Sequence, residues 1–590
     1  MAIAVLIKQV PKASYLALGE DRLLRREEVE TEINPYCRRA LAQGIDLAAK
    51  LGEPCVAVTM GPAGARRAVI EAVAAGADRG VHLFDRAFSG SDSLATARAL
   101  AALLEREGPF SAVIAGKLAV DSETGAVPAQ LAELLDLPLL SAARKLRLDG
   151  GRIWIESELD DGWLQASAEL PAVISCAERL CSPAKFTEEA VAEVAPEAVT
   201  VVTASDLGPG EWGLAGSPTR VGRVRRVAVD RLRLIGEGDL AIQAKAAAGL
   251  ARSRAQEGAR NRPGTVPVTP AATGATVAVL CEPGRGGREL IGLAARLARG
   301  CGAGVVALSP GEESPGHPFY AWGADRLVHL GSSRLPDETA WSLAGWCQEE
   351  RPLAVLVPAT SWGREAASRA AAALGAGLVA EASGVEVDPE SGRLVGVKPA
   401  LAGSELAEIA VPSGIQLITV SPESQELLDP RAEGTLEVEV FAPAIGRSRV
   451  AVHASGVNDH PGALTNARMV IGVGQGVDPG AYAEIIALFG DLGVELAATR
   501  KVTDRQWLPR ARQIGITGRH IAPELYVAVG LSGKFNHMVG VSAAGTVIAV
   551  NPDREAPVFD LCDFGIVAPW EEVLPLLARE LGSPGEEAAS

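Results

Sequence analysis

The sequence has few of the residues that metal sites and disulfide frameworks need. Seven histidines and eight cysteines are spread over 590 residues. There is no CxxC pair and no His/Cys cluster at zinc spacing. Scattered cysteines are typical of free thiols in a reducing compartment, so we expect a cytoplasmic protein without a metal. The cysteines are Cys37, Cys55, Cys176, Cys181, Cys281, Cys301, Cys347 and Cys562.

The chain also lacks a long apolar segment and an excess of positive charge. No apolar run reaches the roughly 18 residues that a membrane span needs. At the start, "MAIAVLIKQVPK" carries its lysine after the apolar run, whereas a signal peptide carries its charge first. The formal net charge is -17, which argues against binding to a phosphate backbone. We therefore expect no transmembrane segment and no nucleic-acid partner.

Aromatic residues are scarce, whereas small and aliphatic residues are common. The chain is 48% hydrophobic and has 64 glycines, which suits helices packed on buried parallel strands. Apolar runs alternate with helical periodicity, as in strand "PCVAVTMG", helix "GARRAVIEAVAAG" and strand "RGVHLF". This alternation predicts doubly wound α/β domains with mostly parallel sheets, and the length suggests three or four domains.

Two segments of the chain repeat each other. "GADRGVHL" at 76–83 returns as "GADRLVHL" at 323–330, and "SAVIAGKLAVDSETGAVPAQLAELLDLPLL" is echoed by "LAVLVPATSWGREAASRAAAALGAGLV". Both matches occur at nearly the same offset. We infer that residues 1–195 and 276–440 share one α/β fold, because a repeat of this size indicates duplicated or fused domains.

The remaining segments differ from the repeat. Residues 196–262 contain loops and one helix, so we expect an arm that extends from the first domain. Residues 263–275 are rich in Pro, Thr and Gly and read as a linker. A third α/β unit covers 446–590, with loops at the carboxyl ends of its strands, where open sheets bind ligands.

Unusual loops gather in this third unit. "IGVGQGVDPG" could bring backbone amides to a pyrophosphate, although its spacing is not GxGxxG and a plain turn explains it equally well. In "AATRKVTD", Arg500 could cap a helix, pair with Asp504 or lie over an anionic ring. In "GLSGKFNHMVG", His537 could be a satisfied imidazole or face a ligand. Together these loops suggest a binding site in which several loops surround an extended ligand.

These motifs resemble the electron transfer flavoprotein family. The third unit resembles the FAD domain of its α subunit through "TRKVTD", "QIGITG", "APELYVAVGLSGKFNHMVG", "AVNPDREAP" and "DFGIV". Residues 276–420 resemble the first domain of the α subunit through "SWGREAASRAAAALG". Residues 1–250 resemble the β subunit through "IKQVP", "INPYC", "GKLAVDSETG" and "GSPTRV". The resemblance implies a single-chain fusion in which β-like and α-like halves associate, ending in a Rossmann-like FAD-binding domain.

The resemblance implies an electron carrier without substrate turnover of its own. Such proteins accept electrons from flavin-dependent dehydrogenases, for example those of fatty acid β-oxidation that act on acyl-CoA, and pass them to a membrane quinone reductase. In keeping with this, the sequence shows no Ser/His/Asp order and no carboxylate pair placed for acid–base work. Where the family tends to carry a lysine-rich helix, residues 177–199 are acidic, which predicts a partner with a different surface.

The resemblance also implies a set of FAD-binding residues. Arg500 matches an arginine against the isoalloxazine, and His537 a histidine near its pyrimidine end. Gln475 replaces a family arginine near the phosphates. The predicted set is Gln475, Thr499, Arg500, Gln513, Ile514, Gly515, Ile516, Thr517, Gly518, Ser532, Gly533, Lys534, Phe535, Asn536, His537, Asn551, Asp563 and Trp570.

A second nucleotide site is implied in the β-like half, where family members bury an AMP or, in some cases, a second FAD. In this chain, however, Gly125 and Val127 offer only backbone donors, so AMP, FAD and an empty structural loop stay open. The predicted residues are Leu6, Asn34, Pro35, Tyr36, Cys37, Met60, Gly116, Asp121, Thr124, Gly125 and Val127.

Three functions remain open on the sequence alone. A carrier with one redox FAD predicts about one flavin per chain. An electron-bifurcating variant predicts two FADs and bleaching by NADH. A nucleotide-binding module without redox activity predicts a colourless protein.

Overall fold

The chain forms two compact units in the computed structural model. The first comprises Met1–Arg225, Gly264–Leu401 and Glu405–Gly456, and the second chiefly Arg226–Pro263 and Val457–Ser590. The predicted arm, 196–262, is therefore divided between them. The structure describes residues 1–12, 30–160, 162–226, 231–260, 264–268, 274–283, 287–311, 318–331, 334–400, 405–432, 434–443, 446–457, 463–464, 467–515 and 518–582.

The first unit begins with a sheet whose strand order is β11-β5-β4-β1-β6-β10-β7-β8-β9-β24. Pairing is parallel from β11 to β7, and antiparallel from β7 to β9. The strands are β1 (Ala2–Leu6), β4 (Cys55–Met60), β5 (Arg79–Leu83), β6 (Phe110–Gly116), β7 (Leu139–Asp149), β8 (Arg152–Glu158), β9 (Gly162–Glu169), β10 (Ala172–Cys176), β11 (Val199–Val202) and β24 (Ala451–Val457). A separate antiparallel pair joins β2 (Gln9–Pro11) and β3 (Thr31–Ile33).

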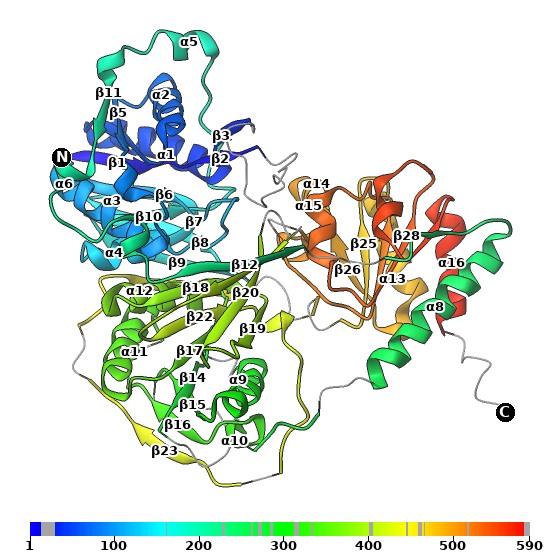
Figure 1. The fold of residues 1–590 in the computed structure, drawn as a ribbon. Helices are drawn as coiled ribbons and strands as arrows, with labels where there is room; N and C mark the ends of the chain where they lie inside the picture. The colour runs from blue at the N-terminus through cyan, green and yellow to red at the C-terminus, as the bar shows by residue number, and fades with distance from the viewer. Residues whose placement is uncertain are drawn as a thin grey trace. The chain divides into compact units, whose positions relative to one another are not determined.

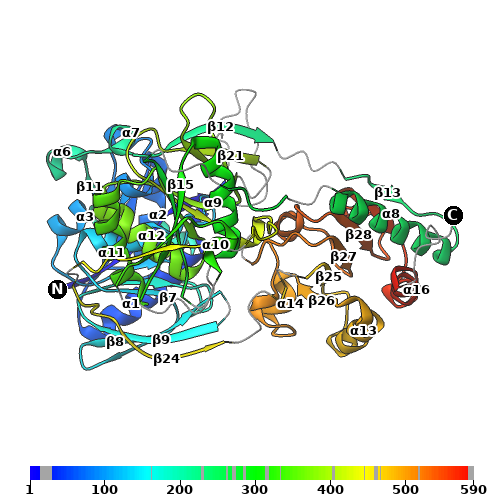
Figure 2. The same ribbon diagram turned by 90° about the horizontal axis from the view of Figure 1, so that it is seen from below.

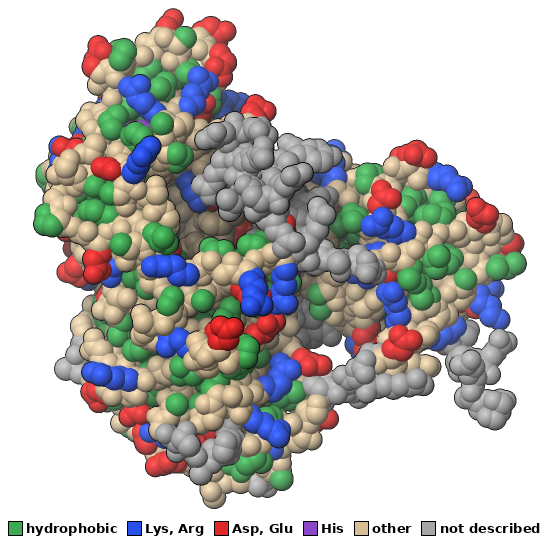
Figure 3. All heavy atoms as spheres, in the orientation of Figure 1, with side chains coloured by type: hydrophobic (Ala, Val, Ile, Leu, Met, Phe, Trp, Pro, Cys, Tyr) green, Lys and Arg blue, Asp and Glu red, His purple; other side chains and the backbone are tan. Residues whose placement is uncertain are grey.

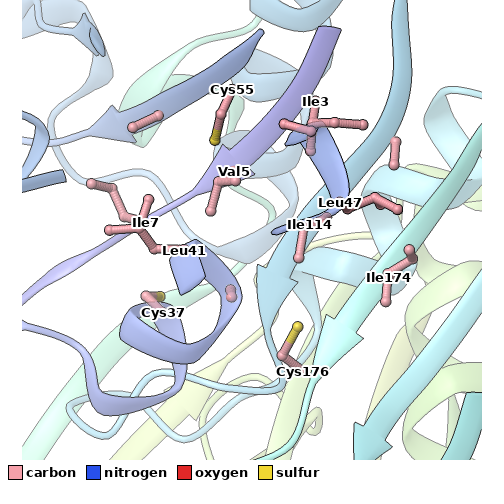
Figure 4. Packing of buried hydrophobic residues seen from close by; sticks show 14 of the residues in the cluster. Ile3, Val5, Ile7, Cys37, Leu41, Leu47, Cys55, Ile114, Ile174 and Cys176 are labelled. Atoms are coloured by element: carbon pink, nitrogen blue, oxygen red, sulfur yellow. The ribbon is translucent and has the colours of Figure 1, made fainter. Parts of the chain in front are cut away.

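Helices cover both faces of this sheet. On one face, α1 packs on β1 and β6, and Val5, Leu41 and Ile114 meet in the core (Figure 4). Helix α1 starts at Pro35, whose missing N–H is no loss at a first helical position, and is capped after Leu51 by Gly52 in the left-handed conformation. The helices are α1 (Pro35–Leu51), α2 (Arg66–Ala74), α3 (Ser93–Glu107), α4 (Val127–Leu134), α5 (Glu188–Ala192), α6 (Ala204–Leu207) and α7 (Gly213–Gly216).

The other main sheet of the first unit has the order β18-β22-β17-β14-β15-β16-β23. Its strands are β14 (Thr276–Leu280), β15 (Gly304–Ser309), β16 (Arg326–His329), β17 (Ala354–Pro358), β18 (Gly377–Ala382), β22 (Gln416–Val420) and β23 (Glu437–Val440). A smaller sheet has the order β12-β21-β20-β19, formed by β12 (Arg220–Arg226), β19 (Gly384–Val387), β20 (Leu394–Ala400) and β21 (Glu405–Ala410). The helices are α9 (Arg288–Cys301), α10 (Phe319–Trp322), α11 (Pro336–Glu350) and α12 (Ser361–Leu374).

The two main sheets confirm the internal repeat. Strands of the second sheet occupy the same positions as strands of the first sheet. In chain order, the positions of β1, β4, β5, β6, β10 and β11 are taken by β14, β15, β16, β17, β22 and β23. The repeats also exchange edge strands: β12 from the β-like half pairs with β21, and β24 from the α-like half lies beside β9 (Figure 2). This exchange was not expected from the sequence, because both strands lie in segments without a repeated motif.

A buried polar contact joins the repeats where α4 packs against α12. Arg369 is 2% exposed and donates to Glu133 at 3.1 Å and to Glu365 at 3.3 Å. The indole N–H of Trp341 donates to the same Glu133 at 3.0 Å. Ala126 of the β-like half lies in the core of the α-like domain. The two repeats therefore share a packed interface within one unit.

Each repeat also contains the same bulge. Ala142 in β7 and Glu381 in β18 have φ values of 51° and 60°, which are rare for residues other than glycine. In both bulges the freed N–H donates to a hydroxyl on the neighbouring strand at 2.8 Å, Ser175 for Ala142 and Thr419 for Glu381. The hydroxyl replaces the acceptor that a regular strand would supply.

We predict that Thr419→Val destabilises the first unit by about 1–3 kcal/mol, because the buried N–H of Glu381 then lacks its acceptor. Thr59→Val is the matched control, since the Thr59 hydroxyl is buried and has no hydrogen-bond partner among the described residues. Urea unfolding of the two variants measures the difference. Equal losses in both would contradict the role of the hydroxyl in the bulge.

The second unit is built on a sheet with the order β13-β29-β28-β27-β25-β26, in which neighbouring strands run parallel. Helix α8 packs beside α16 (Figure 1). The strands are β13 (Leu234–Ile235), β25 (Met469–Val473), β26 (Glu495–Ala498), β27 (Leu525–Val529), β28 (Thr546–Val550) and β29 (Phe564–Ile566). The helices are α8 (Leu240–Arg260), α13 (Tyr482–Leu488), α14 (Arg500–Asp504), α15 (Phe535–Met538) and α16 (Trp570–Gly582).

Candidate functional site

The sheet of the second unit reverses its winding between β25 and β27. The chain passes from β25 to β26 on one side and then returns to place β27 on the other side of β25. The loops that leave the carboxyl ends of β25 and β27 therefore turn toward opposite faces of the sheet. In open α/β sheets this switch point leaves a crevice where ligands bind.

Glycines let the two switch-point loops meet backbone to backbone. The amide of Gly476 donates to the carbonyl of Gly530 at 3.0 Å, and that of Gly474 donates to Val529 at 3.0 Å. A Cβ atom at Gly474 would lie 2.2 Å from the Gly530 oxygen. Gly530 itself has a φ of 58°, which favours glycine. Larger residues would force the loops apart.

The loop after β27 is anchored by the loop after β28. Gly533 has a φ of 74°, and a Cβ atom there would lie 2.3 Å from the backbone nitrogen of Val558. The buried amide of Asn551 donates to the carbonyl of Leu531 at 2.9 Å, and its oxygen accepts from the amide of Asp553. Ser532 and Lys534 of this loop stay exposed.

The loops after β26 lie at the same carboxyl edge of the sheet. Thr499 precedes α14, and Arg500, whose side chain is 47% exposed, donates to Asp504 at 3.3 Å. The oxygen of the Gln475 amide, turned toward Arg505, accepts from both terminal nitrogens of that guanidinium at 3.0 Å. Arg500 therefore forms an ion pair with Asp504, which was one of the roles expected for it. About half of the Arg500 side-chain surface remains exposed.

A turn follows at 513–515. Gln513 is fully buried, and its oxygen accepts from the hydroxyl of Thr503 at 2.7 Å. Ile514 donates its amide to Ala498 at 3.0 Å, and Gly515 has a φ of 120°. Ile516 and Thr517 of the predicted set lie outside the described residues, as do the side chains of Phe535 and Asn536.

His537 is buried rather than exposed in the crevice. Its Nε2 atom lies 2.6 Å from the hydroxyl of Tyr526, and its Nδ1 atom lies 3.3 Å from the carbonyl oxygen of Ile514. Burial lowers the pKa of His537 to about 4, so the imidazole is neutral near pH 7. Here the ring contacts the protein at both nitrogens, as in the satisfied-imidazole interpretation.

Two predicted residues lie apart from the switch point. Asp563 precedes β29, so it is at the amino edge of the sheet, where it is fully buried and pairs with Arg231 at 2.9 Å and Arg254 at 2.8 Å. Trp570 begins α16 and is partly buried against the core. Asp563 is a predicted cofactor contact, and in the structure its carboxylate pairs with the two arginines of the arm.

The residues at the carboxyl edge suit an elongated anionic cofactor such as FAD. Gly474, Gly476 and Gly530 let the loops after β25 and β27 pack closely, which brings the segment after Gly530 to the carboxyl edge of the sheet. The exposed hydroxyl of Ser532 and the cations of Lys534 and Arg500 supply donors at the same edge. The donor set therefore fits the phosphates and the flavin ring of FAD.

The predicted second site gathers at the carboxyl edge of β1, β4 and β6 in the first unit. Buried Asn34 donates to the carbonyl of Leu118 at 2.8 Å, and its oxygen accepts from Val120 at 3.2 Å. Asp121 pairs with Lys8 at 2.8 Å. Of the other predicted residues, Leu6, Met60 and Gly116 end their strands, Pro35 to Cys37 open α1, and Thr124 to Val127 lead into α4.

Close packing also fixes the loop at this second site. A Cβ atom at Gly116 would lie 2.8 Å from Cβ of Tyr36. Gly125 has a φ of 60°, and a Cβ atom there would lie 3.0 Å from Cδ of Arg364 in the α-like domain. Lys398 donates to the carbonyl of Ser122 at 2.8 Å. The α-like half therefore holds the loop in place.

Sequence reasoning missed several of these partners. Tyr526 lies in an apolar run, Arg254 in a helical stretch and Arg231 in a segment without a motif, so none of them was singled out. Only the scarcity of tyrosine, with five in the chain, marks Tyr526 within "ELYVAVG". The arginines carry no local signal, since their partner Asp563 lies more than 300 residues away in the sequence.

Comparison with known proteins decides the family. Residues 22–207 and 285–445 match the electron transfer flavoprotein domain, and residues 463–542 match the electron transfer flavoprotein FAD-binding domain. The chain belongs to the electron transfer flavoprotein family. The double match follows the internal repeat, and the FAD-binding match includes the loops after β25, β26 and β27.

Relatives of both subunit kinds match different parts of this flavoprotein. The α subunit of Mycobacterium leprae is 32% identical over 47% of the chain and 87% of its own length. The β subunit of Thermoanaerobacterium thermosaccharolyticum is 36% identical over 38% of the chain and 86% of its own length. Protein FixB of Escherichia coli is 34% identical over 38% of the chain and 73% of its own length. The chain is thus a fusion of a β-like and an α-like part.

In the part of the flavoprotein that the structure describes, the helices are too short or too polar to cross a membrane.

Proposed function

We propose that this electron transfer flavoprotein binds one FAD at the switch point of β25 and β27 and carries electrons between other flavoproteins. Donors would be flavin-dependent dehydrogenases of the acyl-CoA dehydrogenase type, and the acceptor a quinone reductase or similar protein. The observation that carries the proposal is the topological switch point of β25 and β27, which lies within the matched FAD-binding domain. FAD supplies the redox chemistry, since it exchanges one or two electrons.

The residues of the chain would bind and orient this cofactor. The backbone amides of Ser532 and Gly533 would face the pyrophosphate, together with the Ser532 hydroxyl. The guanidinium of Arg500 would lie against the flavin ring, where a fixed positive charge favours added electron density. Lys534 adds a second exposed cation at the same edge.

A surface of the first unit would influence the choice of partner. Helix α5 and the segment after it expose Glu188, Glu189, Glu193 and Glu197, and acidic side chains gather there in Figure 3. Such a surface attracts a basic partner and repels an acidic one. We therefore propose a dehydrogenase partner with a basic docking face.

The free cysteines support a reducing compartment, and we propose that the protein works in the cytoplasm.

We also propose a second nucleotide at the Asn34–Cys37 and Asp121–Val127 loops, with AMP as the first candidate and a second FAD as the alternative. The buried, fully bonded Asn34 and the loop ion pair Lys8–Asp121 support a preformed site. A second FAD would make the protein an electron-bifurcating variant that oxidises NADH.

Flavin content tests these functions directly. We predict about one FAD per purified chain, no bleaching by NADH in the absence of a partner, and AMP in the nucleotide extract. Absorbance after denaturation, chromatography of the released nucleotides and an anaerobic NADH titration measure all three. Two FADs with NADH-dependent bleaching would favour bifurcation, and a protein that neither contains nor takes up FAD would contradict the carrier.

A further inference from the structure

A chain of hydrogen bonds links three loops of the candidate flavin site through Tyr526. This tyrosine is fully buried on β27, and its hydroxyl lies 2.6 Å from Nε2 of His537 on α15. The Nδ1 atom of His537 lies 3.3 Å from the oxygen of Ile514. Ile514 in turn donates its amide to Ala498, the last residue of β26, at 3.0 Å. The chain thus runs from the central strand to the end of β26.

The chemistry of these groups fixes the hydrogens. A carbonyl oxygen only accepts, so Nδ1 of His537 carries the hydrogen that points to Ile514. In a neutral imidazole the other nitrogen then accepts, and the hydroxyl of Tyr526 donates to it. Burial raises the pKa of Tyr526, which keeps that hydroxyl protonated. Each polar side-chain atom of Tyr526 and His537 therefore has one hydrogen-bond partner, a donor where the atom accepts and an acceptor where it donates.

Two glycines make room for the pair. A Cβ atom at Gly472, on the neighbouring strand β25, would lie 1.6 Å from the Tyr526 hydroxyl oxygen. The φ of Gly472 is not positive, so space rather than backbone conformation calls for glycine here. A Cβ atom at Gly540 would lie 2.5 Å from the amide nitrogen of Gly515. The segment after α15 therefore packs directly on the turn at 513–515.

We propose that Tyr526 is a positioning residue for the flavin site, which acts through His537 to hold the turn Gln513–Gly515 at the carboxyl edge of the sheet. The inference rests on the proposed FAD function. In this role His537 is a neutral link between the Tyr526 hydroxyl and the Ile514 carbonyl. The brace fixes where the loop after β26, with Thr499 and Arg500, lies relative to the loop after β27.

The test compares Tyr526→Phe with Tyr482→Phe in the full chain. Tyr482 is a matched control, because its hydroxyl is buried in the same unit and has no hydrogen-bond partner among the described residues. We expect Tyr526→Phe to speed hydrogen exchange of the 513–515 amides about tenfold and to weaken FAD binding about tenfold, as expected for one lost buried hydrogen bond. Tyr482→Phe should change neither.

A spectroscopic measurement separates the brace from a general loss of stability. In protein with 15N-labelled histidine, the Nε2 resonance of His537 should shift in Tyr526→Phe, because that nitrogen loses its donor. Gly472→Ala should give the same shift, since the added methyl displaces the hydroxyl. An unchanged resonance with unchanged exchange in Tyr526→Phe, or equal effects in Tyr482→Phe, would overturn the proposal.

The same experiment distinguishes failure of the brace from failure of the function. Exchange and the His537 resonance are measured on the chain without FAD, so they decide the brace alone. If FAD binds normally to wild type and to Tyr526→Phe, the positioning role is overturned while the carrier function stands. If wild type binds no FAD, the carrier function fails, and faster exchange in Tyr526→Phe still supports the brace.

Discussion

Asp563→Ala should destabilise the second unit by about 3–5 kcal/mol, the usual effect of removing one partner from a buried ion pair. The carboxylate is fully buried and accepts from Arg231, Arg254 and the amide of Val547. Without it, the charge of Arg231, whose side chain is 6% exposed, remains buried without its counter-charge. Hydrogen exchange of β28, β29 and α8 in increasing urea measures the loss.

The matched control for this variant is Glu524→Ala. Glu524 pairs with Arg468 at 2.8 Å in the same unit, but the two side chains are 45% and 77% exposed. Exposed pairs contribute at most about 1 kcal/mol, so the control should stay close to wild type. A similar small effect in both variants would show that Asp563 does not hold the arm to the sheet.

Acidification should destabilise the second unit by about 3 kcal/mol through His537 alone. Burial lowers the folded-state pKa of His537 to about 4 from its ordinary value of 6.5. Between these values the unfolded chain binds a proton that the folded chain does not, so stability falls as pH falls from about 6.5 to about 4. Above that window the contribution of the neutral imidazole is fully present.

His537→Gln provides the comparison for this prediction. Glutamine does not titrate, so the stability of the variant should depend less on pH across the window, while the carboxylates contribute equally to both proteins. Urea unfolding at several pH values, followed by exchange of β27 amides, measures the difference. A direct titration by NMR should leave the His537 ring neutral down to about pH 5. Parallel stability curves, or protonation near pH 6.5, would contradict the assignment.

Much of the fold followed from periodic patterns in the sequence. The alternation of strands and helices predicted parallel α/β sheets, and the match of "GADRGVHL" with "GADRLVHL" predicted the repeat that the two strand orders confirm. The exchange of β12 and β24 between the repeats was not predictable in this way. Pairing of edge strands depends on which edges meet in space, and a local pattern does not record that.

The candidate site, like the fold, was predicted only in part from the sequence. Glycine-punctuated loops after β25 and β27 were expected from the sequence, since Gly530 and Gly533 supply the positive φ values that such turns require. The partner of His537 was not expected, because Tyr526 lies on a strand in an apolar run. The setting of Asp563 also escaped prediction, since both of its arginines come from the β-like half of the chain.

By itself the sequence determined the class of fold, the repeat and the family, because periodicity and short motifs are local properties of the chain. Only the tertiary structure decided which buried polar groups satisfy one another. It places the Tyr526 hydroxyl against His537 and two arginines against Asp563. Most buried donors and charges are satisfied by whichever partner the fold brings within about 3 Å, whatever the separation along the chain.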